Sequence, residues 1–298
     1  MTDNLKKILC LAVTGVLLLS GCEREEESVP SEILVSGTSF EEEKQQPFPA
    51  SSCGVKLEKA VEKAVSLSPA VTEIICEAGF RDKLVGVSDY CDFPEKLDLP
   101  KFGSTENPDM DAIIKLKPDA VFTLSLLSER EIYKLNQAGI KVLTANMPRN
   151  LEEYSAMYKE ISAAFLGNAL ANEQKGETMA LAVGKRARSA LENAAAAVKL
   201  GSFVYVTEKL TVAGTDTFES AVLSLSGENL CKSEGYVAPE NVQPDYIIAS
   251  DKLNYETLAN DAVFSAMIYN GAKIVYVDAT KFERPSSRTA EIFSKLSD

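Results

Sequence analysis

Short apolar runs alternate with helix-patterned segments along the first half of the chain. The apolar runs cover residues 64–68, 84–87, 120–124 and 141–144. Pro69 follows a Ser and Pro108 follows an Asn at the start of two helix-patterned segments. Proline at the first helical position is a helix-start signal. Strands that alternate with helices at this pitch predict a parallel sheet, and the functional loops of such a sheet leave the carboxyl ends of its strands.

The same alternation returns in the last third of the chain. Strand candidates cover residues 203–207, 246–249 and 273–277, and residues 217–225 have a helical pattern that ends near Gly-Glu-Asn at 227–229. We therefore predict an α/β protein with two Rossmann-like lobes, an N-terminal lobe at residues 55–150 and a C-terminal lobe at residues 200–298.

An unusually long helical stretch, residues 151–199, connects the two predicted lobes. It is rich in Ala, Glu, Lys and Leu, and Gly167, Gly176 and Gly184 interrupt it. A helix of more than about 25 residues without heptads is unusual as a connection between α/β halves. Two alternatives stay open from the residues alone: one long connecting helix, or two ordinary packed helices.

The N-terminus has the pattern of a targeting segment. Lys6 and Lys7 precede an apolar run at 8–19, and Leu-Ser-Gly-Cys follows at 19–22. This order predicts a lipoprotein signal peptide at residues 1–21 and lipidation of Cys22, whereas a transmembrane anchor needs about 18 or more apolar residues. Residues 22–54 are charged and aperiodic, which predicts an acidic flexible linker. The mature protein is then expected in the periplasm or at the cell surface, lipid-anchored to the membrane.

Composition narrows the possible functions. The chain has 298 residues, a formal net charge of −13 and no His. The lack of His excludes His-based catalytic triads and His-ligated metal or haem, and an acidic chain without a basic cluster is a poor nucleic-acid binder. Four cysteines remain beyond the signal peptide and Cys22, with no CxxC spacing: Cys53, Cys76, Cys91 and Cys231. We expect no metal site and no resident cofactor, and the spacing leaves the disulfide state open.

Two loops at predicted carboxyl strand ends carry aromatic and charged residues. Tyr90 lies in the loop 88–94, and Phe282, Glu283 and Arg284 lie in the run 282–288 after the last strand. An aromatic ring beside a guanidinium suits a large, partly polar ligand with amides or carboxylates. The structural alternatives are that Tyr90 only packs against its loop, and that Pro285 with Ser286 or Ser287 begins the terminal helix.

These motifs resemble the cobalamin, siderophore and haem class of ABC-transporter substrate-binding proteins over roughly residues 63–296. The resemblance implies two lobes joined by a single long backbone helix, a ligand cleft between them and no enzymatic activity. The chain also has no Walker A motif, so ATP hydrolysis must be carried out by other chains.

The similarity is greatest to the cobalamin-binding members of the class, although this chain lacks their cleft tryptophans. This similarity implies that the protein captures cobalamin or a related corrinoid and delivers it to an ABC importer. Their ligand contacts fall at Tyr90, Thr280, Lys281, Phe282, Glu283 and Arg284.

The class also presents one carboxylate per lobe to the permease subunits. Asp111 matches the first-lobe position, and Glu240 is the second-lobe candidate; the alternative for each is an ordinary acid at a helix N-terminus. A monomer is expected. The alternative cargo is haem, with Tyr90 as an axial ligand, or a ferric siderophore. A hydrolase that uses Asp89 and Asp92, or a scaffold lipoprotein, is the alternative from another class of function.

Overall fold

The computed structural model describes residues 46–104, 106–168, 171–172 and 177–297. The predicted signal peptide, the lipidation candidate Cys22 and most of the predicted linker lie outside these residues. Residues 44–298 form one compact unit, and the description below concerns its described part. Within those residues, no helix has both the length and the apolar character needed to cross a bilayer.

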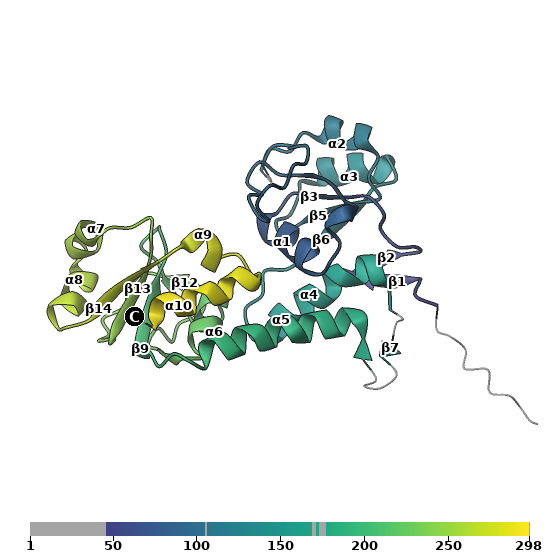
Figure 1. The fold of residues 1–298 in the computed structure, drawn as a ribbon. Helices are drawn as coiled ribbons and strands as arrows, with labels where there is room; N and C mark the ends of the chain where they lie inside the picture. Colours follow the sequence, from purple (N-terminus) through teal and green to yellow (C-terminus); the bar gives the residue numbers. More distant parts are fainter. Residues whose placement is uncertain (1–45, 105, 169–170, 173–176, 298) are drawn as a thin grey trace, which may run out of the picture. The chain divides into compact units, whose positions relative to one another are not determined.

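The first lobe is a four-stranded parallel sheet covered by helices (Figure 1). Its strands are β3 (Ala64–Ser66), β4 (Leu84–Val87), β5 (Ala120–Thr123) and β6 (Lys141–Thr144), in the order β4-β3-β5-β6. Its helices are α1 (Pro69–Glu77), α2 (Met110–Leu116) and α3 (Glu129–Gln137), and a 3₁₀ turn, η1, spans Arg81–Lys83. All pairings are parallel, so the four carboxyl ends meet at one edge of the sheet.

Alternate residues of these strands fill two separate cores. Val65 and Val121 pack with Ile113 and Leu135 of α2 and α3. Ala64, Ala120 and Phe122 belong to the larger core that also contains α1. Both faces of the sheet are therefore buried, which explains why its strands are continuous apolar runs rather than alternating ones.

The second lobe has a six-stranded mixed sheet. Its strands are β9 (Gly201–Val206), β10 (Val212–Ala213), β11 (Gly227–Asn229), β12 (Tyr236–Val237), β13 (Tyr246–Ser250) and β14 (Lys273–Val277). The order is β12-β10-β9-β13-β14, with β11 on β9; only β10 pairs antiparallel, with β9 and β12. The helices are α6 (Phe218–Leu223), α7 (Tyr255–Asn260), α8 (Ala262–Tyr269), α9 (Ala279–Phe282) and α10 (Ile292–Leu296), with η2 at Ser287–Glu291. The two α/β sheets confirm the predicted fold class, and Gly-Glu-Asn forms β11 rather than a helix end.

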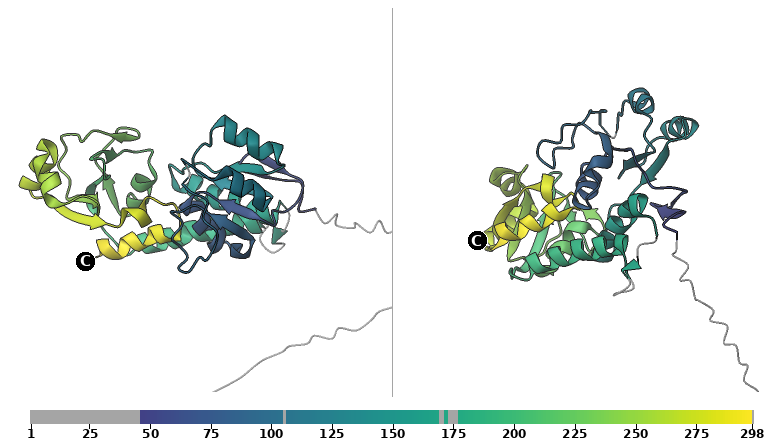
Figure 2. Two further views of the ribbon diagram at one scale, coloured as in Figure 1. Left: turned by 90° about the horizontal axis from the view of Figure 1, so that it is seen from above. Right: turned by 45° about the vertical axis from the view of Figure 1, so that its right-hand side comes forward.

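Residues 151–199 do not form one unbroken helix, because two helices occupy that stretch, as in the second of the two alternatives. These are α4 (Leu151–Leu166) and α5 (Met179–Ala195), with the short strands β7 (Ala171–Asn172) and β8 (Glu177–Thr178) between them. Gly167 ends α4 at a positive φ of 69°, where a Cβ would collide with the carbonyl oxygen of Pro47. Gly184 does not break α5; it lets α5 approach Ser155 of α4 closely. The C-terminal α10 lies beside α5 in both views of Figure 2.

The predicted linker boundary at residue 54 is also wrong. Strands β1 (Ala50–Ser52) and β2 (Val55–Leu57) form a hairpin that begins inside the predicted linker. The Ser52 hydroxyl donates to the Glu160 carbonyl of α4 at 2.7 Å, and the Asn168 side-chain amide donates to the Pro49 carbonyl at 3.0 Å. The charged, aperiodic composition of residues 22–54 hid this hairpin, although Leu57 is buried in the larger core and Phe48 and Val55 pack against that core.

Candidate functional site

The loop after β4 presents Tyr90 on a well-anchored backbone. The Asp89 amide donates to the Gly103 carbonyl at 2.8 Å, and the Cys91 amide donates to the Ser88 carbonyl at 3.2 Å. Lys101 adds a bond from its ammonium to the Cys91 carbonyl at 2.6 Å. Tyr90 itself is 62% exposed, and its side chain has no hydrogen-bond partner among the described residues. The loop therefore holds a free aromatic ring at the carboxyl edge of the first sheet.

Two neighbouring loops add exposed apolar side chains at the same edge. Leu126 follows β5 and is 86% exposed, and Met147 follows β6 and is 37% exposed. Sequence reasoning missed both residues. The available signal was an apolar residue directly after a predicted parallel strand, in a loop where polar residues are expected. By contrast, the loop after β3 contributes nothing at the surface, because residues 66–68 are buried and lead directly into α1.

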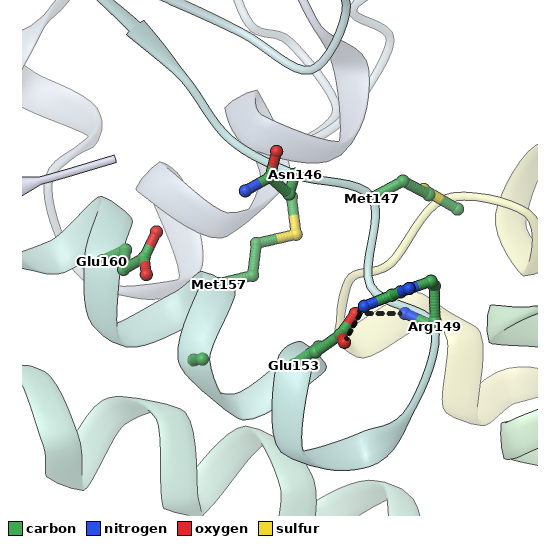
Figure 3. A pocket seen from close by; sticks show the side chains of 7 residues that line it. Asn146, Met147, Arg149, Glu153, Met157 and Glu160 are labelled. Atoms are coloured by element: carbon green, nitrogen blue, oxygen red, sulfur yellow. Dashed lines mark hydrogen bonds and ion pairs between the residues drawn. The ribbon is translucent and has the colours of Figure 1, made fainter. Parts of the chain in front are cut away.

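A hollow of about 530 Å³ lies beside Met147 (Figure 3). Met157 and Ala156 of α4 contribute apolar surface to it. On its polar side Arg149 makes a bidentate pair with Glu153, at 2.8 Å and 3.2 Å, drawn as dashed lines in Figure 3. Tyr90 is not among the residues that line this hollow. The hollow therefore extends the Met147 end of the edge and is distinct from the Tyr90 loop.

The residues predicted after the last strand have different environments. Phe282 is only 1% exposed and packs edge-to-face on Tyr205, with ring centroids 5.0 Å apart. Glu283 accepts a hydrogen bond from the Tyr205 hydroxyl at 2.8 Å, and its burial raises the pKa of its carboxyl group. Lys281 is half-buried and pairs with Glu291 at 2.7 Å, a bond that raises the pKa of its ammonium; Thr280 is half-buried on α9. Phe282 thus supports Glu283 from within the core and offers no surface to a ligand.

A second acid–tyrosine pair lies close to Glu283. Glu219, in the first turn of α6, is fully buried and accepts a hydrogen bond from the Tyr236 hydroxyl at 2.7 Å. Burial raises the pKa of Glu219 to about 7, and the charge of Glu283 adds to this shift. Tyr236 is half-exposed at the edge of the sheet. The carboxyl edge of the second sheet is therefore rich in hydrogen-bonding groups, unlike that of the first.

The run Arg284–Arg288 joins the two lobes. Arg284 Nη1 lies 2.6 Å from Asp92 Oδ1, in the Tyr90 loop, and 3.6 Å from Glu73 Oε1 of α1. The Ser286 hydroxyl donates to Glu73 at 2.6 Å and caps η2, so the predicted helix start is present, with Pro285 before the cap rather than at the first helical position. Glu73 is completely buried, and this burial raises the pKa of its carboxyl group. The structure thus brings together the two sequence motifs predicted to form the site.

The two predicted docking acids differ in their surroundings. Asp109, not Asp111, caps α2 by accepting from the Ala112 amide at 3.0 Å. The Asp111 side chain stays 79% exposed, and its nearest cation is Lys134 at 3.7 Å. Glu240 lies outside any helix and accepts from the Ser233 hydroxyl at 2.5 Å. Asp111 lies in the first turn of α2, so the alternative explanation, an ordinary acid at a helix N-terminus, still applies to it, whereas Glu240 lies in no helix.

Comparison with known proteins places this chain in a family. A family model described as periplasmic binding protein matches residues 65–267, more than half of the chain. An uncharacterized ABC transporter substrate-binding lipoprotein of Bacillus subtilis, YvrC, is 27% identical over 257 residues, covering 80% of this chain and 78% of that protein. A vitamin B12-binding protein of Vibrio campbellii is 25% identical over 257 residues, covering 79% and 88%.

Solved structures agree on the fold. The periplasmic vitamin B12-binding protein BtuF of Vibrio cholerae matches with a TM-score of 0.56 and 25% identity, covering 80% of this chain and 95% of that one. The haem-binding protein BhuT, solved with two haems, matches with a TM-score of 0.62 at 18% identity, covering 79% and 98%. The chain belongs to the periplasmic binding protein family of B12, haem and siderophore ABC transporters. It is a substrate-binding protein of such a transporter, not an enzyme.

Proposed function

We propose that this protein captures cobalamin or a closely related corrinoid outside the cytoplasm. The observation that carries the proposal is the pair of unlike carboxyl edges, one apolar and one hydrogen-bonding, tied together by Arg284 and Asp92 at 2.6 Å. A corrinoid has broad apolar faces and a rim of amide groups, so it needs both kinds of surface. The similarity to B12-binding proteins supports this cargo.

The two edges divide the ligand contacts. Tyr90, Leu126 and Met147 form the apolar platform, on which a macrocycle face packs by dispersion and aromatic stacking. Thr280, Lys281, Glu283 and Arg284 supply hydrogen bonds to the amide rim, and the absence of tryptophan leaves Tyr90 as the main aromatic surface. Phe282, being buried, acts only through Glu283.

Two acidic residues are the candidates for docking on the importer. Asp111 of the first lobe, with Glu240 of the second, docks on arginines of the permease subunits, because charge-assisted pairs fix orientation. Acyl chains on Cys22 keep the protein at the membrane surface, where its partner lies.

Calorimetric titration of the purified protein with cyanocobalamin tests the cargo. The expected result is one-to-one binding that weakens at least about tenfold in Tyr90→Ala, since a large aromatic contact is lost. Tyr133→Ala is the matched control, because Tyr133 is 65% exposed on α3 of the same lobe. If cyanocobalamin and its base-free precursor give no heat, the corrinoid proposal fails.

Haem is the second candidate, favoured by the phenol of Tyr90, which has no hydrogen-bond partner among the described residues. Tyrosine oxygen is a known ligand of ferric haem iron. Tyr90→Phe separates the two cargoes, because it keeps the ring but removes the oxygen. Corrinoid affinity is expected to survive this substitution. A haem-binding protein would instead lose its iron–phenolate absorption bands in Tyr90→Phe.

A further inference from the structure

We propose that Arg284 and Arg288 act as a two-arginine clamp that positions the Tyr90 loop from the second lobe. The inference rests on the proposed function in one respect, that Tyr90 is the ligand platform. It adds three positioning residues, Asp92, Phe93 and Arg288, and one common anchor, Glu73.

Both arginines reach the second half of the same loop. Arg284 Nη1 lies 2.6 Å from Asp92 Oδ1. The Arg288 guanidinium lies over the ring of Phe93, 4.7 Å from its centroid, a cation–π arrangement. Asp92 and Phe93 directly follow the short stretch that carries Tyr90. Two successive loop residues are thus held by two arginines that lie four residues apart in sequence.

The arginines are themselves fixed by one buried carboxylate. Glu73 lies 3.2 Å from Arg288 Nε through Oε2 and 3.6 Å from Arg284 Nη1 through Oε1. The Ser286 hydroxyl donates to the same Oε2 at 2.6 Å, and the Thr289 hydroxyl donates to the Arg284 carbonyl at 2.9 Å. The side chains of Arg284 and Arg288 are 19% and 10% exposed, so solvent screens these contacts weakly.

The two halves of the loop are anchored in different lobes. Main-chain bonds to Ser88 and Gly103 and the Lys101 ammonium anchor the stretch from Asp89 to Cys91 within the first lobe. The side chains of Asp92 and Phe93 are anchored across to the second lobe. A loop that is already held in place loses less conformational entropy when the ligand arrives. Arg284 therefore acts on Tyr90 through Asp92, whatever further contact its remaining N–H groups make with a ligand.

The absence of tryptophan permits a direct test without any ligand. Tyr90→Trp introduces a single fluorescent reporter on the platform. In that background, Asp92→Asn and Phe93→Leu remove the two clamp contacts at the partly exposed loop and leave the buried cluster intact. Glu152→Gln is the matched control, because it breaks a comparable Arg188–Glu152 pair, 2.7 Å long, between α4 and α5. Unfolding midpoints confirm that each variant is folded.

Because loss of a clamp contact frees the loop, we expect lower tryptophan anisotropy and stronger acrylamide quenching in Asp92→Asn and Phe93→Leu. We expect no change in Glu152→Gln. Calorimetry with cyanocobalamin on the same substitutions in the Tyr90 background is expected to show about tenfold weaker binding. Unchanged fluorescence in both loop variants, or an equal change in Glu152→Gln, overturns the clamp. Because fluorescence is read without ligand, a changed reporter with no cyanocobalamin binding refutes the proposed cargo and leaves the clamp standing.

Discussion

The carboxyl edges of the two sheets have opposite surface chemistry. The first lobe exposes Tyr90, Leu126 and Met147 there, one from each of three successive strand ends. The second lobe has half-buried Glu283 and half-exposed Tyr236, whose hydroxyl donates to the buried Glu219. The difference teaches that the two lobes are not interchangeable halves of a site. In the proposed function, the first lobe receives an apolar face of the ligand and the second receives its polar rim.

The topology of each sheet accounts for this difference. The first sheet is entirely parallel, so its strand ends open into separate loops that are free to display apolar residues. In the second sheet, antiparallel β10 and β12 return across the edge of β9 and carry Tyr236 to Glu219. A buried carboxyl group is tolerated there because a tyrosine hydroxyl satisfies it.

The largest effect is expected where the two edges are joined. Glu73→Gln removes the charge that Arg284 and Arg288 share, and it leaves Arg288 buried without a counterion. Breaking one partner of a buried pair costs about 3–5 kcal/mol, and we expect a loss of that size in the free energy of unfolding. Urea unfolding measures it, with Glu152→Gln as the exposed-pair control. A loss below about 1 kcal/mol would show that the lobes are not coupled through Glu73.

The free energy of unfolding is expected to depend on pH through the polar edge of the second lobe and not through the apolar edge of the first. The pKa of Glu219 is raised to about 7 from 4.5, so the folded state holds this proton more tightly than the unfolded state does. The stability that this group contributes is full below pH 4.5 and is lost as the pH rises to 7. The difference amounts to about 3 kcal/mol at 1.36 kcal/mol per pKa unit.

Glu219→Gln tests this directly, because a neutral amide cannot titrate. Unfolding free energies at pH 5 and pH 8 should differ less in Glu219→Gln than in the wild type, by up to about 3 kcal/mol. Comparing the two proteins cancels the titration of other groups. An identical pH dependence in both would place the Glu219 pKa near its ordinary value.

The apolar edge is tested by a smaller substitution. Leu126→Ala is expected to weaken cyanocobalamin binding about tenfold, since a leucine side chain contributes about 1.5–3 kcal/mol when it is buried against a ligand. Stability should not change, because the side chain is exposed in the free protein. Met179→Ala, at another exposed apolar position, serves as the control. Equal affinity in both variants would remove Leu126 from the platform.

The smallest effect on ligand affinity is expected at the docking acids. Asp111→Asn should leave cyanocobalamin affinity unchanged and reduce uptake of labelled cyanocobalamin by cells that depend on this protein. Glu240→Gln is expected to reduce uptake less, because Ser233 already engages its carboxylate. Normal uptake in Asp111→Asn would mean that docking uses other residues.

The sequence predicted the strands well and the connecting region poorly. Strands β4, β6 and β14 fall at the predicted residues, because buried parallel strands are continuous apolar runs bounded by polar turns. The break between α4 and α5 was only one of two open alternatives, because it depends on a tertiary contact. Only the approach of Pro47 explains why Gly167 ends a helix while Gly184 continues one.

The candidate site was partly predictable for a similar reason. Tyr90 and the Arg284 segment were found from motif and position, but periodicity does not show that Phe282 points into the core beside Tyr205. Nothing in the sequence around Glu73 distinguishes it from an ordinary polar residue of a helix. Its role became visible only when the chain brought it within 3.2 Å of Arg288, far away in sequence.

The most direct test of the account is to locate the cobalt atom. Crystals grown with cyanocobalamin give an anomalous signal from cobalt that requires no assumption about the pose. The account predicts one strong peak at the carboxyl edges, with the corrin ring stacked on Tyr90 at a ring separation of about 4.5–7 Å. A cobalt peak remote from Tyr90 and Glu283 would contradict it, as would none in crystals grown at saturating cyanocobalamin.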